Sequence, residues 1–319
     1  MKMTYQVLVT SRSFGSTSET PMRILIEAGC EVVRLPAGAK LDEDSLVDSL
    51  QSIDGWIAGT EPITAGVMAA APKLRTIAKH GVGVDNIDLA AAQAGGITVT
   101  NTPGANTEAV AELAIGLMFA LARQVVYADR QLRAGGWKPL VGVELAGKTL
   151  GIVGLGRIGR LVVRRLAGFE MNILAHDPAR DEEFARQHRV RYCALDELLG
   201  EADVVSLHAP VTPETRGLLG AVQLSQMKQT AFVINTARGE LIDETALVEA
   251  LREKRIAGAG LDVFACEPPG DSPLFRLDNV IVTPHMGAHT GDAITAMSVL
   301  AAEDLVASLH GRPVLHRVV

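Results

Sequence analysis

Short apolar segments alternate with amphipathic segments along most of the chain. In the first third, the apolar segments YQVLVT, EVVRL, GWIAG and RTIAKH are separated by stretches with helical spacing of apolar residues. Strands that are apolar at consecutive positions are typical of a parallel sheet covered on both faces. The alternation therefore predicts βα units and an α/β fold.

A second series of the same kind begins at KTLGIVGLG, residues 148–156. Its later apolar segments are NILAHD, DVVSLHA, AFVINTA, AGAGLD and VIVTP, and a final helix is expected over 291–309. Two such series predict two doubly wound parallel-sheet domains with a cleft between them. Between them, residues 107–123 are apolar nearly all round, which predicts a helix buried in an interface or, alternatively, an ordinary core helix.

Composition narrows the setting of this fold. Hydrophobic residues make up 48 % of the 319 residues, the net charge is −7, and there is no arginine- or lysine-rich run, so nucleic acid is not expected as a partner. No apolar stretch reaches the roughly 18 residues of a membrane span, and no secretory leader is visible. Three scattered cysteines argue against a disulfide framework. We therefore expect a cytoplasmic protein, and no spacing of residues indicates a metal site.

Three glycines, Gly154, Gly156 and Gly159, form the pattern G-x-G-x-x-G between an apolar segment and a helical one. In a dinucleotide-binding turn the first glycine allows the tight turn, the second lets the pyrophosphate approach the backbone, and the third lets the helix pack against the strand. The alternative is a strand-to-helix turn with purely structural glycines. The context favours a dinucleotide.

Backbone amides at the start of the following helix, with Arg157 and Ile158 as candidates, would face the phosphates. Asp177 ends the next apolar segment. Its carboxylate would accept hydrogen bonds from the ribose hydroxyls and repel a 2′-phosphate. The predicted cofactor is therefore NAD rather than NADP.

Charged side chains follow three of the late strands. Arg238 follows AFVINT, Asp262 follows AGAG with Glu267 in the loop beyond it, and His285 follows VIVTP. Ligands of parallel sheets bind beyond the carboxyl ends of the strands, so these side chains are expected at one edge, on the side of the glycine loop.

Oxidation of an alcohol with NAD removes a hydride from carbon and a proton from oxygen. Histidine is the natural base near neutral pH, which suggests His285. A carboxylate beside it, Glu267, would orient the ring and stabilise the imidazolium. An arginine binds a substrate carboxylate in a bidentate fork, which suggests Arg238.

Each of these residues has a structural alternative. His285 would only cap a strand end, Glu267 would be solvated loop charge, and Asp262 would stabilise a turn. Arg238 would pair with an acid of its own loop, Glu240 or Asp243. Further candidates for the base are His80, His208 and His289.

Taken together, the motifs resemble those of the NAD-dependent D-isomer-specific 2-hydroxyacid dehydrogenases, in particular the branch of phosphoglycerate dehydrogenase. The resemblance covers nearly the whole chain and is carried by KHGVGVDNID, NTPGANTEAVAE, GKTLGIVGLGRIG, LHAPVTPETRGLL, INTARGELID, GLDVFACEPP and TPHMGAHT. It implies interconversion of a small D-2-hydroxyacid and its 2-keto acid. The catalytic arginine, glutamate and histidine of the family fall on Arg238, Glu267 and His285.

The resemblance also implies contacts that the spacing does not. Backbone amides of Val82 and Gly83 would bind the substrate carboxylate, together with Arg238 and His285. Pro210 would flank the adenine. The nicotinamide half of the cofactor would contact Thr107, Thr236, Asp262, His285 and Gly287.

Domain organisation follows from the same resemblance. A Rossmann NAD-binding domain, residues 102–287, would be inserted into a flavodoxin-like substrate domain made of residues 1–101 and 288–319. Family members are usually homodimers through the inserted domain, and the apolar helix at 107–123 suits that interface.

Two departures from the phosphoglycerate dehydrogenase pattern bear on the substrate. The chain stops at Val319, so serine feedback through a regulatory domain is not expected. Glu61 stands where these enzymes often carry an arginine, and Arg12, Lys79 and Lys138 are the cations that would replace it for a phosphate. Unphosphorylated hydroxypyruvate and glyoxylate are thus alternative substrates, and a non-catalytic NAD-binding module of the corepressor kind is the alternative from another class.

Overall fold

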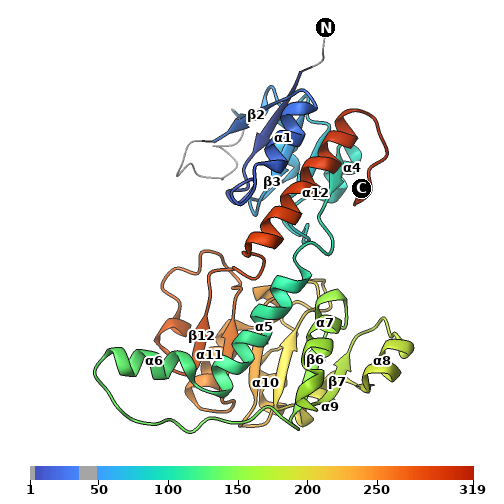
Figure 1. Cartoon of the computed structure of the whole chain (residues 1–319). Helices are drawn as coiled ribbons and strands as arrows, with labels where there is room; N and C mark the ends of the chain where they lie inside the picture. Colours follow the sequence, from blue (N-terminus) through green and yellow to red (C-terminus); the bar gives the residue numbers. More distant parts are fainter. Residues whose placement is uncertain (1–3, 36–48) are drawn as a thin grey trace. The chain divides into compact units, whose positions relative to one another are not determined.

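The computed structural model describes residues 4–35 and 49–319. Its contacts divide the chain into unit 1, residues 1–106 with 288–319, and unit 2, residues 107–287 (Figure 1). The sequence placed the two crossings after residues 101 and 287. The first falls later because Thr102 is buried and its amide donates to the carbonyl of Gly81 in unit 1, at 3.0 Å.

Unit 1 is built on a five-stranded sheet of order β2-β1-β3-β4-β5 in which all pairs are parallel. β3 and β4 are buried at every position, as expected for strands covered on both faces. The strands are β1 Tyr5–Val9, β2 Cys30–Arg34, β3 Gly55–Ala58, β4 Thr76–Lys79 and β5 Thr98–Thr100, and the helices are α1 Thr20–Glu27, α3 Ala65–Ala69, α4 Leu89–Ala94 and α12 Gly291–Leu309.

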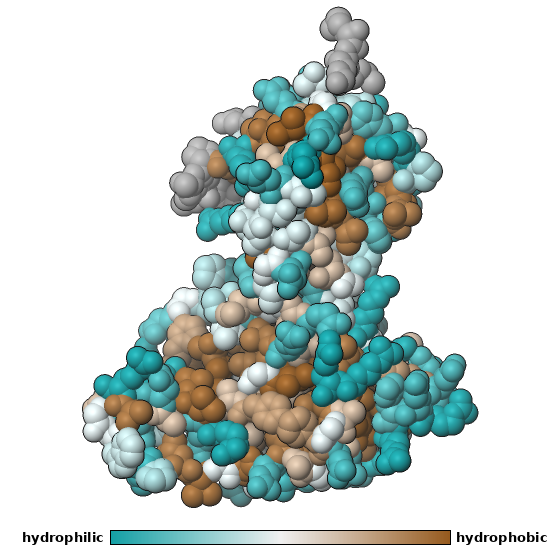
Figure 2. Space-filling model, in the orientation of Figure 1, coloured by the Kyte–Doolittle hydropathy of each residue, from teal (hydrophilic) through white to brown (hydrophobic). Residues whose placement is uncertain are grey.

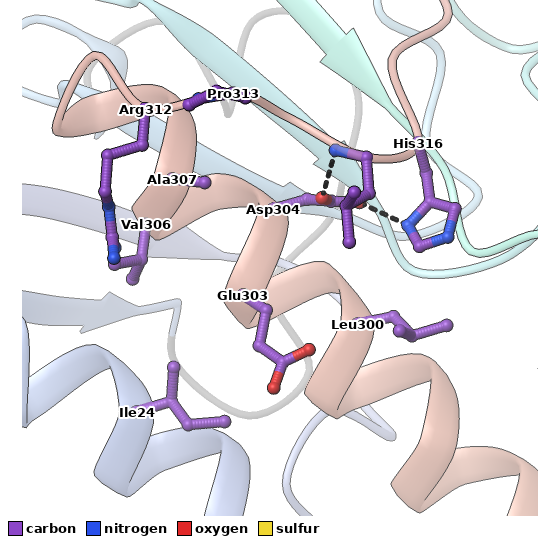
Figure 3. Close-up of a pocket in the computed structure, with 10 residues that line it drawn as sticks. Ile24, Leu300, Glu303, Asp304, Val306, Ala307, Arg312, Pro313 and His316 are labelled. Carbon is purple, nitrogen blue, oxygen red and sulfur yellow. Dashed lines mark hydrogen bonds and ion pairs between the residues drawn. The ribbon is translucent and has the colours of Figure 1, made fainter.

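The last residues of the chain return to the edge of this sheet. The amide of Val318 donates to the carbonyl of Val99, at 2.7 Å, beside β5. Buried Asp304 of α12 holds this segment, because its carboxylate accepts from the amide of Leu315, at 3.1 Å, and contacts Nδ1 of His316, at 2.8 Å. Figure 3 shows this anchor beside a pocket of about 450 Å³ between α12 and the C-terminal segment. The predicted site residues do not line this pocket.

Unit 2 is built on a seven-stranded parallel sheet of order β12-β11-β10-β9-β6-β7-β8. The chain runs outward from β6 to β8 and then restarts at β9 on the other side of β6. The strands are β6 Thr149–Val153, β7 Asn172–His176, β8 Val190–Tyr192, β9 Val204–Leu207, β10 Phe232–Asn235, β11 Gly258–Leu261 and β12 Val280–Val282. Strand order reverses at β6 and β9, and ligands of such sheets bind at that reversal.

Helices cover both faces of this sheet (Figure 1). They are α5 Thr107–Ala122, α6 Val125–Arg133, α7 Arg157–Arg165, α8 Glu182–His188, α9 Leu195–Glu201, α10 Ala221–Gln226 and α11 Glu244–Arg252, with short 3₁₀ turns η1 Ala167–Phe169, η2 Gly239–Leu241 and η3 Pro273–Arg276. The α/β class with two parallel sheets, predicted from the sequence, is confirmed.

The apolar helix α5 packs against β10, β11 and α7 within unit 2. Its buried face includes Ala114, Leu117, Met118 and Leu121, so at least this face is an ordinary core face. In the described part of the chain no single helix is long and apolar enough to cross a membrane. Only α5 and α6 taken together, as a pair bent by 61°, pass on length and composition.

Candidate active site

The three glycines of the loop between β6 and α7 have different environments. A Cβ at Gly154, where φ is +93°, would lie 2.6 Å from the amide nitrogen of Ala209, and a Cβ at Gly159 would lie 2.3 Å from the carbonyl oxygen of Gly154. Both are therefore glycines because the chain packs against itself. A Cβ at Gly156 would meet nothing within 4 Å, so the protein leaves space at this point.

Gly156 is the N-cap of α7 and provides no side-chain cap for the helix. The first amides of the helix, with Arg157 and Ile158 at its start, therefore lack intrahelical acceptors and suit an anion. At the end of β10, the buried hydroxyl of Thr236 also has no hydrogen-bond partner among the described residues. Open space, helix amides and an unpaired hydroxyl on one sheet edge fit the phosphates and the nicotinamide half of NAD.

Asp177 follows β7, and its carboxylate is half-buried beside the glycine loop. One oxygen, Oδ2, accepts from the amide of Leu155 at 2.7 Å, and the other accepts from the amide of Ala179 at 2.7 Å. These two bonds fix the carboxylate at the edge of the sheet. A carboxylate has about four acceptor sites, so both oxygens retain capacity for the ribose hydroxyls.

The predicted catalytic residues lie at the carboxyl ends of three neighbouring strands. Arg238 follows β10, Glu267 lies in the loop after β11, and His285 follows β12. Nδ1 of His285 and Oε2 of Glu267 are 2.6 Å apart, while Oε1 of Glu267 accepts from the amide of Phe264 at 3.0 Å. The carboxylate thereby fixes the imidazole ring and leaves Nε2 for proton transfer.

The ionisation of Glu267 follows from its neighbours. Burial by itself would raise the pKa of this carboxyl, but the hydrogen bond and charge of His285, the Phe264 amide and the charge of Arg238 outweigh it and lower the pKa. Glu267 is therefore ionised at neutral pH, as a partner for an imidazolium requires.

His285 has a backbone φ of +50°, which is uncommon for a residue with a side chain. Its amide is held by the carbonyls of Asp262 and Thr283, at 2.8 and 3.0 Å. The buried carboxylate of Asp262 fixes the rest of the turn: Oδ1 accepts from the Thr283 hydroxyl at 2.5 Å and the Met286 amide at 2.8 Å, and Oδ2 accepts from the Gly287 amide at 2.7 Å. The structure thus supports the turn-stabilising alternative for Asp262, whose predicted contact with the cofactor has no support in these bonds.

Arg238 directly precedes η2, in a loop whose conformation could not be predicted from the sequence. The buried side chain of Asn235 accepts from the amide of Ala237 at 3.0 Å and donates to the carbonyl of Arg238 at 2.8 Å. A Cβ at Gly239 would lie 1.9 Å from the carbonyl carbon of Phe264, so the loops after β10 and β11 touch backbone to backbone. Neither Asn235 nor Gly239 was predicted as a site residue, although a polar residue at the end of an apolar strand is a usable signal.

The acids proposed as structural partners of Arg238 have other roles as well. Asp243 caps α11 by accepting from the amides of Thr245 and Ala246. Oε1 of Glu240 lies 3.8 Å from Nη1 of Arg216, so this acid forms an ion pair with another arginine.

Two alternative bases are neutral at physiological pH. Burial lowers the pKa of His208 to about 4, and Nε2 of this ring contacts the Ser206 hydroxyl at 2.9 Å. The pKa of His80 is also lowered to about 4, chiefly by burial and in smaller part by the charges of Lys79 and His289. Neither ring titrates near neutral pH, which favours His285 as the base.

The remaining predicted residues lie at loop positions. Thr107 is the first residue of α5, Pro210 follows β9, and the Cβ that Gly287 lacks would lie 3.1 Å from Asp262 Oδ2. Val82 and Gly83 lie in the loop after β4 of unit 1, where the Val82 carbonyl accepts from Asn101 Nδ2 at 2.7 Å. Their contacts with ligands stay predictions.

Comparison with known proteins agrees with this geometry. Residues 115–287 match the family described as D-isomer specific 2-hydroxyacid dehydrogenase, NAD binding domain. A glyoxylate reductase of Korarchaeum cryptofilum is 49 % identical over 305 residues, which cover 92 % of each chain. A D-3-phosphoglycerate dehydrogenase of Methanocaldococcus jannaschii is 44 % identical over 298 residues, which cover 92 % of this chain but only 56 % of that protein.

Among solved structures, the TT0316 protein of Thermus thermophilus is similar with a TM-score of 0.90 and 42 % identity, over 98 % of this chain and 100 % of that one. The comparisons and the nucleotide-binding loop agree on NAD as the cofactor. The chain therefore belongs to the D-isomer-specific 2-hydroxyacid dehydrogenase family and is an NAD-dependent oxidoreductase.

Proposed function

We propose that the protein interconverts a small D-2-hydroxyacid and its 2-keto acid. The observation that carries this proposal is the 2.6 Å contact between Glu267 and His285, next to Arg238, at the carboxyl ends of three neighbouring strands. In this arrangement His285 is the acid/base and Glu267 is the carboxylate that orients it. Arg238 is the cation suited to a carboxylate substrate.

The site residues divide proton transfer and substrate binding between them. Protonated His285 gives a proton from Nε2 to the carbonyl oxygen of the keto acid, and the carboxylate of Glu267 stabilises the imidazolium before this step. Arg238 binds the substrate carboxylate and polarises the adjacent carbonyl. Backbone amides of Val82 and Gly83 are proposed as further donors to the substrate carboxylate. When bound, NADH supplies the hydride.

Replacement of His285 by asparagine tests the proposal. Asparagine tolerates the left-handed backbone at this position, so the variant should fold and bind NADH. Because the proton donor is lost, turnover with hydroxypyruvate or glyoxylate should fall by about two to four orders of magnitude. Turnover is measured from NADH absorbance, and NADH binding from its fluorescence.

The matched control is His289→Asn, which removes an exposed histidine that was another candidate base. It should leave turnover unchanged. Near-normal turnover of His285→Asn would remove His285 from its role. NADH binding by the wild-type protein without turnover of any 2-keto acid would instead favour the non-catalytic module.

The proposal includes a homodimer formed through unit 2. Support comes from large apolar side chains that are exposed on α6 and the segment after it, and Figure 2 shows a further apolar area over neighbouring α5. They are Val125, Leu132, Trp137, Val141 and Val143, with Trp137 and Val141 exposed by 87 and 90 %. Exposed apolar patches of this kind are typical of protein interfaces, and analytical ultracentrifugation measures the assembly directly.

A cytoplasmic location is also part of the proposal. Its support is that Cys30, Cys193 and Cys266 are all free thiols, as is usual in a reducing compartment.

A further inference from the structure

A cluster of buried charged and polar side chains lies at the carboxyl ends of β1, β3 and β4 in unit 1. These strands are neighbours in the sheet. Glu61, in the loop after β3, is 3 % exposed, and Lys79, the last residue of β4, is 6 % exposed. Such charges are rarely buried without partners, so their contacts decide what they do.

The carboxylate of Glu61 is turned towards donors of the protein. The Thr10 hydroxyl donates to Oε1, and the amide of Gly59 lies 3.0 and 3.1 Å from Oε1 and Oε2. Thr10 is itself held by the indole Nε1 of Trp56, at 2.8 Å. Glu61 is therefore a fixed, buried negative charge at this edge of the sheet.

Lys79 is bonded to the same loop from the other side. Its ammonium donates to the carbonyl of Gly59 and to Oδ1 of Asn86, at 3.0 Å, and Asn86 Nδ2 donates to the carbonyl of Glu61 at 2.6 Å. Gly59 thus receives the carboxylate at its amide and the ammonium at its carbonyl. The buried ammonium of Lys79 and the buried carboxylate of Glu61 are thus linked through the backbone of one residue.

This arrangement bears on the substrate because Lys79 directly precedes the loop that carries Val82 and Gly83. A phosphate on the substrate would bring about two further negative charges at neutral pH and would need cations. Of the three cations named as replacements for an arginine, Lys79 is buried in this network and Lys138 belongs to unit 2, so Arg12, exposed after β1, is the one left at this edge.

Resting on the proposed function, we propose that Glu61 is a specificity-determining residue that restricts the substrate to 2-keto acids without a phosphate group. It acts by neutralising Lys79 and by adding a buried negative charge near the substrate loop. In a low-dielectric site such a charge acts over several ångströms, so direct contact with the substrate is not required.

Hydroxypyruvate and 3-phosphohydroxypyruvate share one carbon skeleton and differ by the phosphate, so the ratio of their kcat/KM values is the readout. The wild-type protein should prefer hydroxypyruvate. Glu61→Gln keeps the shape of the side chain and removes its charge, and it should shift the ratio of kcat/KM values towards the phosphorylated acid by about tenfold, because one repulsive charge is removed. Glu31→Gln, which neutralises an exposed acid of β2, should not shift it.

A second variant separates charge from structure. If Glu61 acts by balancing Lys79, the double variant Glu61→Gln with Lys79→Met should return the ratio to near the wild-type value. A purely structural loss would slow both substrates alike and leave the ratio unmoved.

A wild-type preference for 3-phosphohydroxypyruvate, or a ratio that Glu61→Gln does not change, would overturn this inference while the proposed function stands. Absence of turnover with both acids and with glyoxylate would remove the proposed function, and this inference with it.

Discussion

Asparagine in place of Asp262 tests how the turn that carries His285 is held. The native carboxylate accepts three hydrogen bonds: Oδ1 accepts from Thr283 and Met286, and Oδ2 accepts from the amide of Gly287. The side-chain amide of asparagine retains one acceptor oxygen but brings an NH₂ group to the other position. At that position the Gly287 amide, which is buried, would face a donor instead of an acceptor.

The expected loss is one charge-assisted hydrogen bond together with an unpaired buried donor. Such a change lowers the free energy of unfolding by about 1–3 kcal/mol. For a domain the size of unit 2, the midpoint of thermal unfolding would fall by roughly 2–4 °C for each kcal/mol. The turn would also relax, and a displacement of the catalytic ring by about 1 Å lowers turnover by up to about a hundredfold.

Three measurements decide the outcome: the unfolding midpoint, kcat with a 2-keto acid, and the dissociation constant of NADH. We expect the first two to fall and the third to stay within about threefold of the wild-type value. Asp203→Asn is the matched control, because this carboxylate also accepts a backbone amide, from Thr149 at 2.8 Å, and pairs with Lys228 at 2.9 Å, but at the amino ends of the strands. It should lower the midpoint and leave kcat unchanged.

The opposite pattern would refute the reasoning. If Asp262→Asn weakens NADH binding by tenfold or more and leaves the unfolding midpoint unchanged, Asp262 is a cofactor ligand, as the sequence analysis expected, and the turn is held by other groups.

Two further predictions follow from packing and from pH. Gly239→Ala should lower both the midpoint of thermal unfolding and kcat/KM, because its Cβ would lie 1.9 Å from the carbonyl carbon of Phe264. Gly156→Ala has open space at its Cβ, so it should keep the midpoint and weaken NADH binding. Equal unfolding midpoints for the two variants would contradict this prediction. Burial lowers the pKa of His80 from 6.5 to about 4. Between these pH values the unfolded chain binds a proton at this residue and the native chain does not. The free energy of unfolding should therefore fall by on the order of 3 kcal/mol as the pH drops from 6.5 to about 4. Urea denaturation across this pH range should show a shallower fall of the free energy of unfolding for His80→Gln, whose side chain can still bond Ser298. If the variant shows the same pH dependence as the wild-type protein, His80 is not the neutral group responsible for it.

Much of the fold and the core of the site follow from local sequence patterns. Strand and helix periodicity placed the sheets, and the spacing of Gly154, Gly156 and Gly159 located the nucleotide turn. The predicted catalytic residues lie together because the carboxyl ends of parallel strands share one edge of a sheet. The contact between Glu267 and His285 then follows from the adjacency of β11 and β12, which periodicity alone does not give.

The rest depended on conformations that no short motif encodes. Asp262 can hold this turn because His285 adopts a φ of +50°. That conformation places the amides of Met286 and Gly287 around the Asp262 carboxylate. Asn235 is one polar residue at the end of an apolar strand, and its bonds to the Arg238 loop become visible only when the loop is folded.

The acids at the two sheet edges differ in how exposed they are, and this difference separates their roles. Asp262 and Glu61 are buried, and protein donors hold both oxygens of each, so these two acids act through position and charge. Protein groups also contact both oxygens of Asp177 and of Glu267, but these two acids remain partly exposed. A partly exposed carboxylate can still use its remaining acceptor sites for a substrate or cofactor, whereas a buried one is closed off from them. The sequence therefore identifies which acids lie near the site, and their exposure separates those that can meet a ligand from those that hold the protein chain.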